Sequence, residues 1–334
     1  MPSLRFGLLG TGYWALHTHG AALARSPHSR LEGVWGRDPA KARDVAARLG
    51  ATGYEDLDEL LGRVDAVAIS LPPDVQATLA VRAARAGCHL LLDKPLALDV
   101  GLAGAVVDAA STAGVASLVF FTDRFRPGPE RWTEEAARAG AWHSAHILKY
   151  ANIYQPGNPF GASPWRRERG SLWDNGPHAL AALVPIMGEV TSVAARPGPA
   201  GSDTVHLVLT HSGSPDYPVA PGALGATGPG SPGGTSTVSL SLTMAPRATT
   251  NQMVLYGANG INTRPEAPPR PEGQYDSADA MLAAIAELAG LVESGQRSHR
   301  CDARFALGVT RVLAGADAAL ALPAIELGAA GPLA

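Results

Sequence analysis

A glycine-rich turn between an apolar strand and a helix is the feature that most constrains this chain. Leu4–Leu9 is a short apolar run typical of a buried strand, and a helical pattern covers residues 13–25. The turn between them has the pattern Gly-x-Gly-x-x-Ala, in which the first glycine allows a tight turn and the second lets a pyrophosphate approach the backbone. Free N–H groups at the helix N-terminus favour phosphate. We therefore predict a dinucleotide site that includes Gly10, Thr11, Gly12, Tyr13 and Trp14. The alternative is a glycine turn in the same fold that binds no nucleotide.

Strands and helices alternate over the first 120 residues. Further apolar strands are predicted at 31–35, 65–70, 89–92 and 115–120, and helices at 38–49, 56–61, 74–86 and 99–113. Uniformly apolar strands separated by helices are typical of a parallel sheet covered on both faces. The fold class is therefore α/β, with an N-terminal Rossmann doubly wound parallel sheet. The length of 334 residues predicts two domains, and we place the first at residues 1–122.

The second half has a different pattern and predicts a second domain at residues 123–334. Strands are expected at 142–150, 190–195, 204–211, 235–244 and 252–256, and helices at 175–187 and in two amphipathic segments near the end. Successive strands without intervening helices predict an antiparallel sheet. Between two of them, 12 of the 22 residues at 213–234 are Gly or Pro, so we expect a flexible insertion there.

Composition excludes several classes of function. The net charge is −3 and no basic run is present, which argues against nucleic acid as a partner. No apolar run approaches the roughly 18 residues of a membrane span, so no membrane partner is expected, and the N-terminus is interpreted as folded protein rather than a signal peptide. Cys88 and Cys301 lack the spacing of metal ligands, so no metal site is predicted, and so few cysteines fit a reducing, cytoplasmic location.

The end of the second strand bears on the type of dinucleotide. An NAD-selective site usually places an acidic residue there to bind the ribose 2′-hydroxyl. This chain has Gly36 at that place, followed by Arg37, which can receive a 2′-phosphate. The pattern favours NADP over NAD. The alternative is that Arg37 is a solvated surface arginine and Asp38 only caps its helix.

A lysine follows the strand at 89–92, in the segment Leu92-Asp93-Lys94-Pro95. Ligands bind at the carboxyl ends of strands in such sheets, where a lysine can stabilise negative charge on a substrate oxygen. The chain contains 24 arginines but only three lysines, so a lysine at this place is less easily taken as generic. The alternative is an ordinary surface lysine. No role is predicted for Lys41 or Lys149.

A third signal is Asp174 and His178, four residues apart in the segment 170–178. If a helix begins near Asp174, both side chains lie on one face, about one turn apart. Asp174 can then bind a substrate hydroxyl or orient His178, and the imidazole can carry the alcohol proton. The alternative is that Asp174 is an N-cap and His178 is packed.

Together these motifs resemble the glucose–fructose oxidoreductase and inositol dehydrogenase family, called Gfo/Idh/MocA. The resemblance rests on the glycine turn, Asp93-Lys94-Pro95, Trp165-Arg166 and Asp174-x-x-x-His178. It implies a second domain with an open, mostly antiparallel sheet that forms a homodimer or homotetramer, and an active site between the domains. It implies catalytic roles for Lys94, Asp174 and His178. It also implies dinucleotide contacts from Ser70, Leu71, Pro72, Gln76, Asp93, Lys94, Trp165 and Arg166, besides those from the turn, Gly36 and Arg37.

The chain departs from the family pattern at several positions. Asp93 stands where the family usually has Glu, Gln76 where it commonly has His, and Thr122 where it commonly has Asn; residues 165–170 lack the usual triple glycine. None of these changes removes a predicted catalytic residue.

The predicted function is hydride transfer between C4 of a nicotinamide and a secondary alcohol or ketone of a sugar, inositol or related small molecule. His178 would accept the hydroxyl proton, Lys94 would hold the same oxygen, and Asp174 would position a neighbouring hydroxyl or His178. A dinucleotide-binding regulator without turnover is the main alternative. Hydrolysis by transient oxidation of a sugar is another, although nothing in the sequence favours it.

Overall fold

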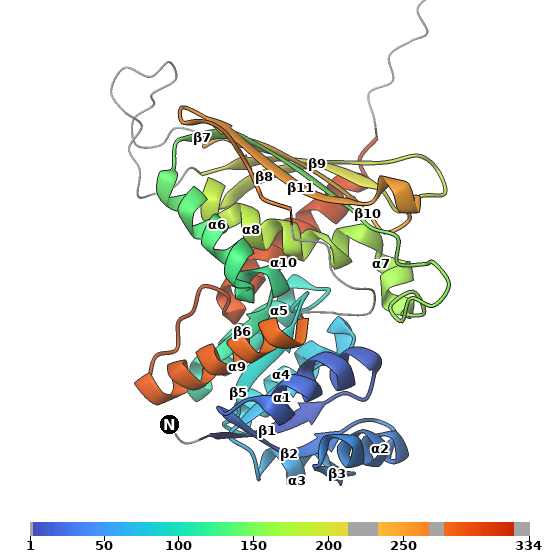
Figure 1. Ribbon diagram of the computed structural model, residues 1–334, viewed down its shortest axis with the longest axis vertical. Helices are drawn as coiled ribbons and strands as arrows, with labels where there is room; N and C mark the ends of the chain where they lie inside the picture. Colours follow the sequence, from blue (N-terminus) through green and yellow to red (C-terminus); the bar gives the residue numbers. More distant parts are fainter. Residues whose placement is uncertain (1–2, 213–232, 267–276, 324–334) are drawn as a thin grey trace, which may run out of the picture.

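Two six-stranded sheets form the framework of the protein (Figure 1). The computed structural model describes residues 3–212, 233–266 and 277–323. The predicted insertion at 213–234 lies outside the described residues, apart from its last two positions. In Figure 1 the first sheet lies below and the second sheet above, with a layer of helices between them.

The first sheet is entirely parallel, with the strand order β3-β2-β1-β4-β5-β6. Its strands are β1 (Leu4–Leu9), β2 (Ser29–Trp35), β3 (Thr52–Tyr54), β4 (Ala66–Ile69), β5 (His89–Asp93) and β6 (Ser117–Phe120). This order is that of a doubly wound dinucleotide-binding domain, in which the connections reverse direction between β1 and β4. The prediction of a Rossmann-type sheet is confirmed. The sequence missed β3, whose three residues are too few to show a pattern.

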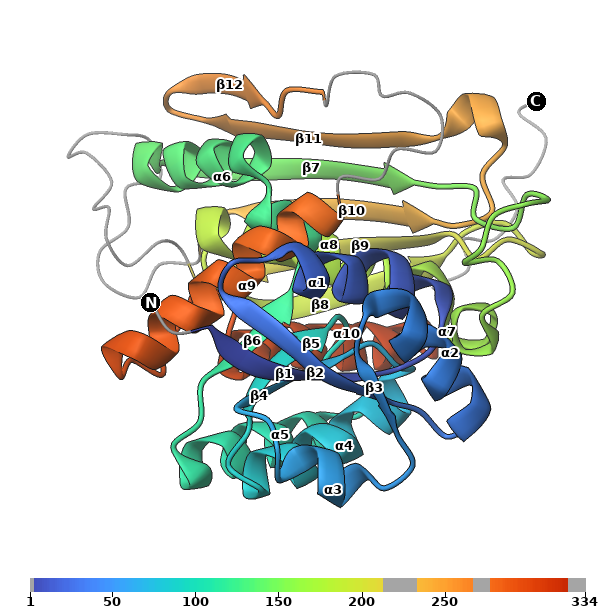
Figure 2. The same ribbon diagram turned by 60° about the horizontal axis from the view of Figure 1, so that its bottom comes forward.

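Helices cover both faces of this sheet (Figure 2). They are η1 (Ala15–Gly20), α1 (Ala21–Arg25), α2 (Pro39–Leu49), α3 (Leu57–Leu61), α4 (Pro73–Arg85) and α5 (Val100–Ala113). The side chain of Asp38 accepts hydrogen bonds from the N–H groups of Ala40 and Lys41, which begins α2, and Gly50 in the left-handed region ends it. Residues 13–25 are helical throughout, as expected, with one π-helical stretch in the middle.

The second sheet is mixed but mostly antiparallel, with the order β12-β11-β7-β10-β9-β8. Its strands are β7 (Trp142–Tyr150), β8 (Val190–Pro197), β9 (Val205–His211), β10 (Thr235–Ser241), β11 (Thr250–Gly257) and β12 (Gly260–Thr263). Only the β7–β10 pair among these is parallel. Alternate residues such as Leu207, Leu209, Val238 and Leu240 are buried on one face, which fits a sheet covered on one side.

The remaining helices are η2 (Thr122–Phe125), α6 (Pro127–Ala139), α7 (Pro164–Asp174), α8 (Gly176–Met187), η3 (Pro246–Ala248), α9 (Ser277–Ser294) and α10 (Ala303–Leu320). Helices α6, α8 and α10 lie beneath the second sheet, whose opposite face carries no described helix (Figure 1). Helix α9 returns to the first sheet and packs near α1, β5 and β6. The two halves of the chain are therefore joined by the packing of α9 as well as by the chain connections between them.

None of the described helices combines the length and the apolar character that crossing a membrane requires.

Candidate active site

The glycine turn lies where the first sheet changes direction, between the carboxyl ends of β1 and β4. Gly10 has a φ of 138°, and a Cβ there would lie 2.4 Å from the carbonyl oxygen of Ser70, so only glycine fits. A Cβ on Gly12 would meet nothing within 4 Å. The backbone at Gly12 is thus open at the start of the helix, which is the space that a pyrophosphate requires. Half-buried Ser70, Leu71 and Pro72 form the adjoining turn between β4 and α4. These residues fit a dinucleotide.

The end of β2 carries no acidic side chain at the position expected to bind the ribose. A Cβ on Gly36 would lie 2.7 Å from Cγ2 of Thr11, so a side chain at position 36 would require the Thr11 side chain to move. Arg37 is exposed beside it, and Asp38 is engaged as the N-cap of α2. Within residues 36–38, Arg37 is the basic side chain and can bind a phosphate. The carboxylate of Asp38 instead accepts hydrogen bonds from the first turn of α2.

Lys94 and Asp174 meet across the two domains. Lys94 follows β5, and its Nζ donates to Oδ1 of Asp174 at 2.7 Å and to the backbone carbonyl of Asp174 at 2.8 Å. Nε of Arg166, on α7, lies 3.2 Å from Oδ2 of the same carboxylate. Burial alone would raise the pKa of Asp174, but Lys94 and Arg166 outweigh it and hold the pKa well below its usual range. Asp174 is therefore an anion between two cations.

His178 lies one helical turn beyond Asp174, on α8. Burial is the main reason that its pKa is well below the usual value, and the positive charges of Lys94 and Lys149 lower it further. The imidazole is thus neutral at neutral pH and can accept a proton. A helix begins near Asp174 and ends at Met187, as expected. Asp174 ends α7, Asn175 is the junction, and α8 begins at Gly176, where no side chain caps the helix.

Gln76 holds the segment that carries Lys94. Its side chain is buried, and its Nε2 donates to the carbonyl oxygens of Asp93, Pro95 and Leu96 at 2.8, 3.1 and 3.3 Å. Its Oε1 accepts from the N–H of Asp93 at 2.8 Å. Both ends of the amide are thus used within the protein. The amide of Gln76 thus positions residues 93–96, and its expected contact with the dinucleotide stays a prediction.

Aromatic side chains from both domains gather beside the glycine turn. The ring of Phe160 lies 6.0 Å from that of Tyr13 and 5.6 Å from that of Trp14. The guanidinium of Arg166 lies over the rings of Trp165 and Phe160, at 4.7 and 5.4 Å from their centroids. The predicted residues Tyr13, Trp14, Trp165 and Arg166 are therefore brought together, and Phe160 joins them although the sequence did not single it out.

Sequence reasoning missed a second charged group beside His178. Lys149 on β7, Asn251 on β11 and Arg264 after β12 line a small cavity together with His178. Asp123 in η2 pairs with Arg264 at 2.7 Å and with Arg126 at 2.8 Å. The sequence pattern could have placed Lys149 on the inner face of the sheet. Residues 145, 147 and 149 lie on the same face of the strand, and Ala145 and Ile147 are apolar and buried.

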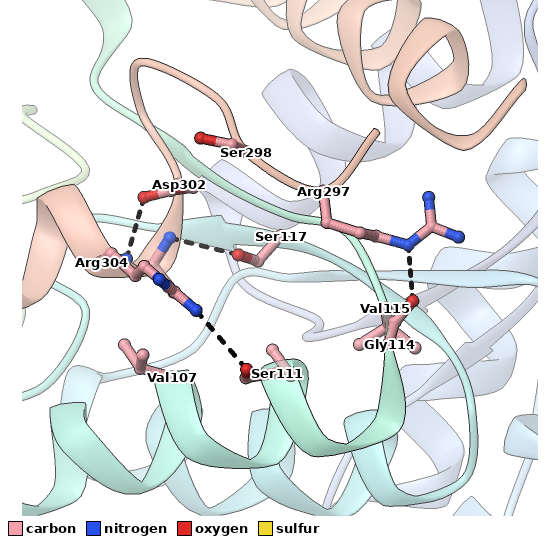
Figure 3. A pocket seen from close by; sticks show the side chains of 11 residues that line it. Val107, Ser111, Gly114, Val115, Ser117, Arg297, Ser298, Asp302 and Arg304 are labelled. Atoms are coloured by element: carbon pink, nitrogen blue, oxygen red, sulfur yellow. Dashed lines mark hydrogen bonds between the residues drawn. The ribbon is translucent and has the colours of Figure 1, made fainter. Parts of the chain in front are cut away.

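A separate cavity of about 220 Å³ lies at the amino end of β6, opposite the edge that carries Lys94. It is enclosed by α5, by the segment before β6 and by the loop that leads into α10 (Figure 3). Arg297 donates to the carbonyl of Gly114, and Arg304 donates to Ser111. This cavity contains none of the predicted site residues, and its arginines are bonded to its own walls.

Comparison with known proteins gives a family match for the first domain. Residues 4–121 match the model of the Gfo/Idh/MocA oxidoreductase family, which is described as having an NAD-binding Rossmann fold. The chain is 32% identical over 192 residues to D-xylose 1-dehydrogenase (NADP(+)) 2 of Haloferax volcanii, which is 55% of this chain and 58% of that protein. It is 36% identical over 129 residues to inositol 2-dehydrogenase of Rhizobium meliloti, which is 37% and 38% of the two chains. The chain thus spans less than two thirds of these relatives.

Solved structures extend the likeness of fold to nearly the whole chain. A putative myo-inositol dehydrogenase from Sinorhizobium meliloti superposes with a TM-score of 0.77 at 20% identity, over 96% of this chain and 98% of the other. UDP-N-acetylglucosamine 3-dehydrogenase from Acidithiobacillus ferrooxidans gives a TM-score of 0.74 at 19% identity, over the same shares. Residues 4–121, which form the first sheet and its helices, thus match the Gfo/Idh/MocA oxidoreductase family, and the likeness beyond them is one of fold.

Proposed function

We propose that the protein is an NAD(P)-dependent oxidoreductase that acts on a secondary alcohol or ketone of a sugar, an inositol or a related polyol. The observation that carries the proposal is the contact of Lys94 with Asp174, one helical turn before His178 and at the same sheet edge as the glycine turn. The family of the N-terminal domain supports it, as do the names of relatives that act on xylose and inositol.

The roles of the three residues follow from their protonation states. A bound dinucleotide supplies the hydride acceptor or donor at its nicotinamide. In the oxidative direction, neutral His178 accepts the proton of the substrate hydroxyl. The Lys94 ammonium donates a hydrogen bond to the same oxygen and stabilises the negative charge that develops there. The Asp174 carboxylate holds Lys94 in place and accepts from a neighbouring substrate hydroxyl.

NADP is the preferred dinucleotide in this proposal. Gly36 supplies no acid to bind a free 2′-hydroxyl, and exposed Arg37 supplies a cation for a 2′-phosphate. The name of the Haloferax volcanii relative, which specifies NADP(+), supports the same choice.

The second sheet is the proposed contact surface of a homodimer or homotetramer. Its outer face exposes Val208, Tyr256 and, at the edge strand, Ile261, whose exposed fractions are 51%, 38% and 69%. Apolar side chains gathered on a sheet face without described helices are suited to association. A small-molecule substrate, a cytoplasmic location and a domain boundary near residue 122 complete the proposal.

A direct test combines dinucleotide binding with turnover. Thermal shift with NAD⁺, NADH, NADP⁺ and NADPH should show stabilisation, largest with the phosphorylated pair. Incubation with NADP⁺ and a panel of sugars, inositols and polyols should then produce reduced nicotinamide, measured by absorbance. Absence of a shift with all four dinucleotides would overturn the proposal. Binding without turnover of any alcohol or ketone would favour a regulator.

A further inference from the structure

A second group of charged side chains borders the site and has no part in the hydride-transfer steps described above. Lys149 extends from β7 towards α8, on the same side of the strand as buried Ala145 and Ile147. Its Nζ donates to Oδ1 of Asn251 at 3.3 Å, and both residues line the cavity that also contains His178 and Arg264. Lys149 is thus the cation of this group that faces His178 from the second sheet.

Lys149 shares its carboxylate neighbour, Asp123, with other cations. Asp123 is the acid of the group, and its oxygens are bonded by Arg264 at 2.7 Å and by Arg126 at 2.8 Å. Burial lowers the pKa of Lys149 to about 8. The attraction of Asp123 opposes this effect, and Arg264, Lys94 and Arg126 add to it. The single negative charge of Asp123 is therefore divided among the Lys149 ammonium and two arginine guanidinium groups.

Positive charge exceeds negative charge throughout this part of the described structure. Among the described residues, four cations, Lys94, Arg166, Lys149 and Arg264, surround the two carboxylates of Asp174 and Asp123. Neutral His178 does not reduce the excess. Buried cations without partners are costly because they lose hydration, and a recess with a surplus of one charge concentrates ligands of the opposite charge. A bound anion beside Lys149 would reduce this excess of positive charge.

We propose that Lys149 and Arg264 bind an anionic group of the substrate, so that the substrate class is the acidic sugars rather than neutral polyols. This inference rests on the proposed function, because it concerns the same site. The reacting hydroxyl lies at Lys94 and His178, while the carboxylate or phosphate of the same molecule lies on the side of His178 that faces β7 and β11. The cavity is small, so the anionic group takes the place of Asn251 at the Lys149 ammonium.

The phosphates of the dinucleotide do not account for this group. They are expected at Gly10–Gly12 and at Arg37, which lie at the ends of β1 and β2 in the first sheet. Lys149 and Arg264 belong to the second sheet, at the opposite wall of the site. The two sets of cations therefore serve different parts of the bound molecules.

The test compares matched neutral and acidic probes on the NADPH-bound protein by isothermal titration calorimetry. D-glucose and myo-inositol are the neutral probes, D-glucuronate and D-gluconate the carboxylates, and glucose 6-phosphate the phosphate. We expect at least one anionic probe to bind about tenfold to a hundredfold more tightly than D-glucose, as a charged hydrogen bond predicts. The anionic probe that binds most tightly shows whether the substrate carries a carboxylate or a phosphate.

Three variants locate the effect. Lys149→Met should remove most of the preference for the anionic probe, Lys149→Arg should retain much of it, and Lys41→Met should leave it unchanged because Lys41 is exposed on α2. A thermal melt of each variant checks that it is folded. Equal affinity for neutral and anionic probes, or a preference that survives Lys149→Met, would overturn this inference. The proposed function is judged separately, by dinucleotide binding and by turnover of any probe, neutral or acidic.

Discussion

Lys94 and Asp174 are 80 positions apart in the sequence, yet the Lys94 ammonium donates to both the side chain and the backbone carbonyl of Asp174, at 2.7 and 2.8 Å. Each residue comes from a different domain, since Lys94 follows β5 and Asp174 ends α7. The contact thus joins the two halves of the protein at the point where the proposed chemistry takes place, and the charge of Lys94 also acts on His178.

Replacement of Lys94 by Met should reduce kcat by about 100- to 1000-fold, because a donor that stabilises developing charge is lost. Dinucleotide affinity should change little, because the glycine turn is untouched. Turnover and calorimetric titration with NADPH measure the two effects. Lys41→Met is the matched control, since the Lys41 side chain is 72% exposed. Near-normal turnover in the Lys94 variant would contradict the assignment.

The pH dependence of kcat/KM should report the neutral form of His178. Burial, Lys94 and Lys149 hold the pKa of His178 well below 6.5, so activity should persist below that pH and fall only when the imidazole is protonated. Lys149→Met removes one positive neighbour, which should raise this pKa and move the acidic limb to higher pH. A neutral substrate is used, so that binding to Lys149 does not contribute. An acidic limb that moves to lower pH in the variant would exclude the proposed base.

Binding of an anionic substrate should weaken at alkaline pH. The pKa of Lys149 is about 8, and the protonated form is the one that attracts an anion. Asp123, Arg264, Lys94 and Arg126 set this value together with burial. As the pH rises through about 8 the ammonium loses its proton, so kcat/KM for the preferred acidic substrate should fall. The profile for a neutral polyol, measured in parallel, should lack this step.

Replacement of Gln76 by Leu should reduce turnover more than dinucleotide affinity. The change removes four hydrogen bonds that hold residues 93–96. It leaves buried backbone groups without partners, which costs about 1–3 kcal/mol of unfolding free energy per group that stays unpaired. Chemical denaturation, kcat and NADPH affinity are the measurements. Gln296→Leu, at an exposed position, is the control. Unchanged stability would show that the amide does not hold the segment.

Arg37 should determine the preference for NADP. The Arg37→Ala variant is expected to lose about tenfold or more in affinity for NADPH, because a charged hydrogen bond to the phosphate is lost. Affinity for NADH should stay the same. Calorimetric titration with both dinucleotides provides the comparison, with the exposed Arg63→Ala as the control. An equal loss for both dinucleotides would place Arg37 away from the 2′-phosphate.

Local signals were enough to predict most of the first domain. Helix α2 has the expected limits: it begins after the N-cap Asp38 and ends at Gly50. Such caps can be predicted because they depend on neighbours in the sequence. The strand at Trp142–Tyr150 was also predicted with its observed limits. Helix α7 was missed, since Gly170 interrupts it with a φ of 63° and its residues show little apolar periodicity. The parallel pairing of β7 with β10 was missed as well, because pairing is a long-range choice.

The candidate site shows the same division. Short motifs with a characteristic spacing made four of the site residues recognisable in the sequence: Gly10, Gly12, Lys94 and His178. Lys149, Asp123 and Arg264 belong to no motif, and they meet only because β7, η2 and the end of β12 pack around α8. The sequence alone also assigned Gln76 to the dinucleotide, whereas packing places its amide against the backbone of the Lys94 segment.

By itself the sequence determined the doubly wound domain, the position of its glycine turn and the residues of the proposed hydride-transfer chemistry, because strand periodicity, caps and tight turns depend on interactions between near neighbours. Only the tertiary structure decided which charges share the site. Electrostatic interactions act through space and strengthen with burial, so the protonation states of His178 and Lys149 follow from side chains that the chain brings together from both domains.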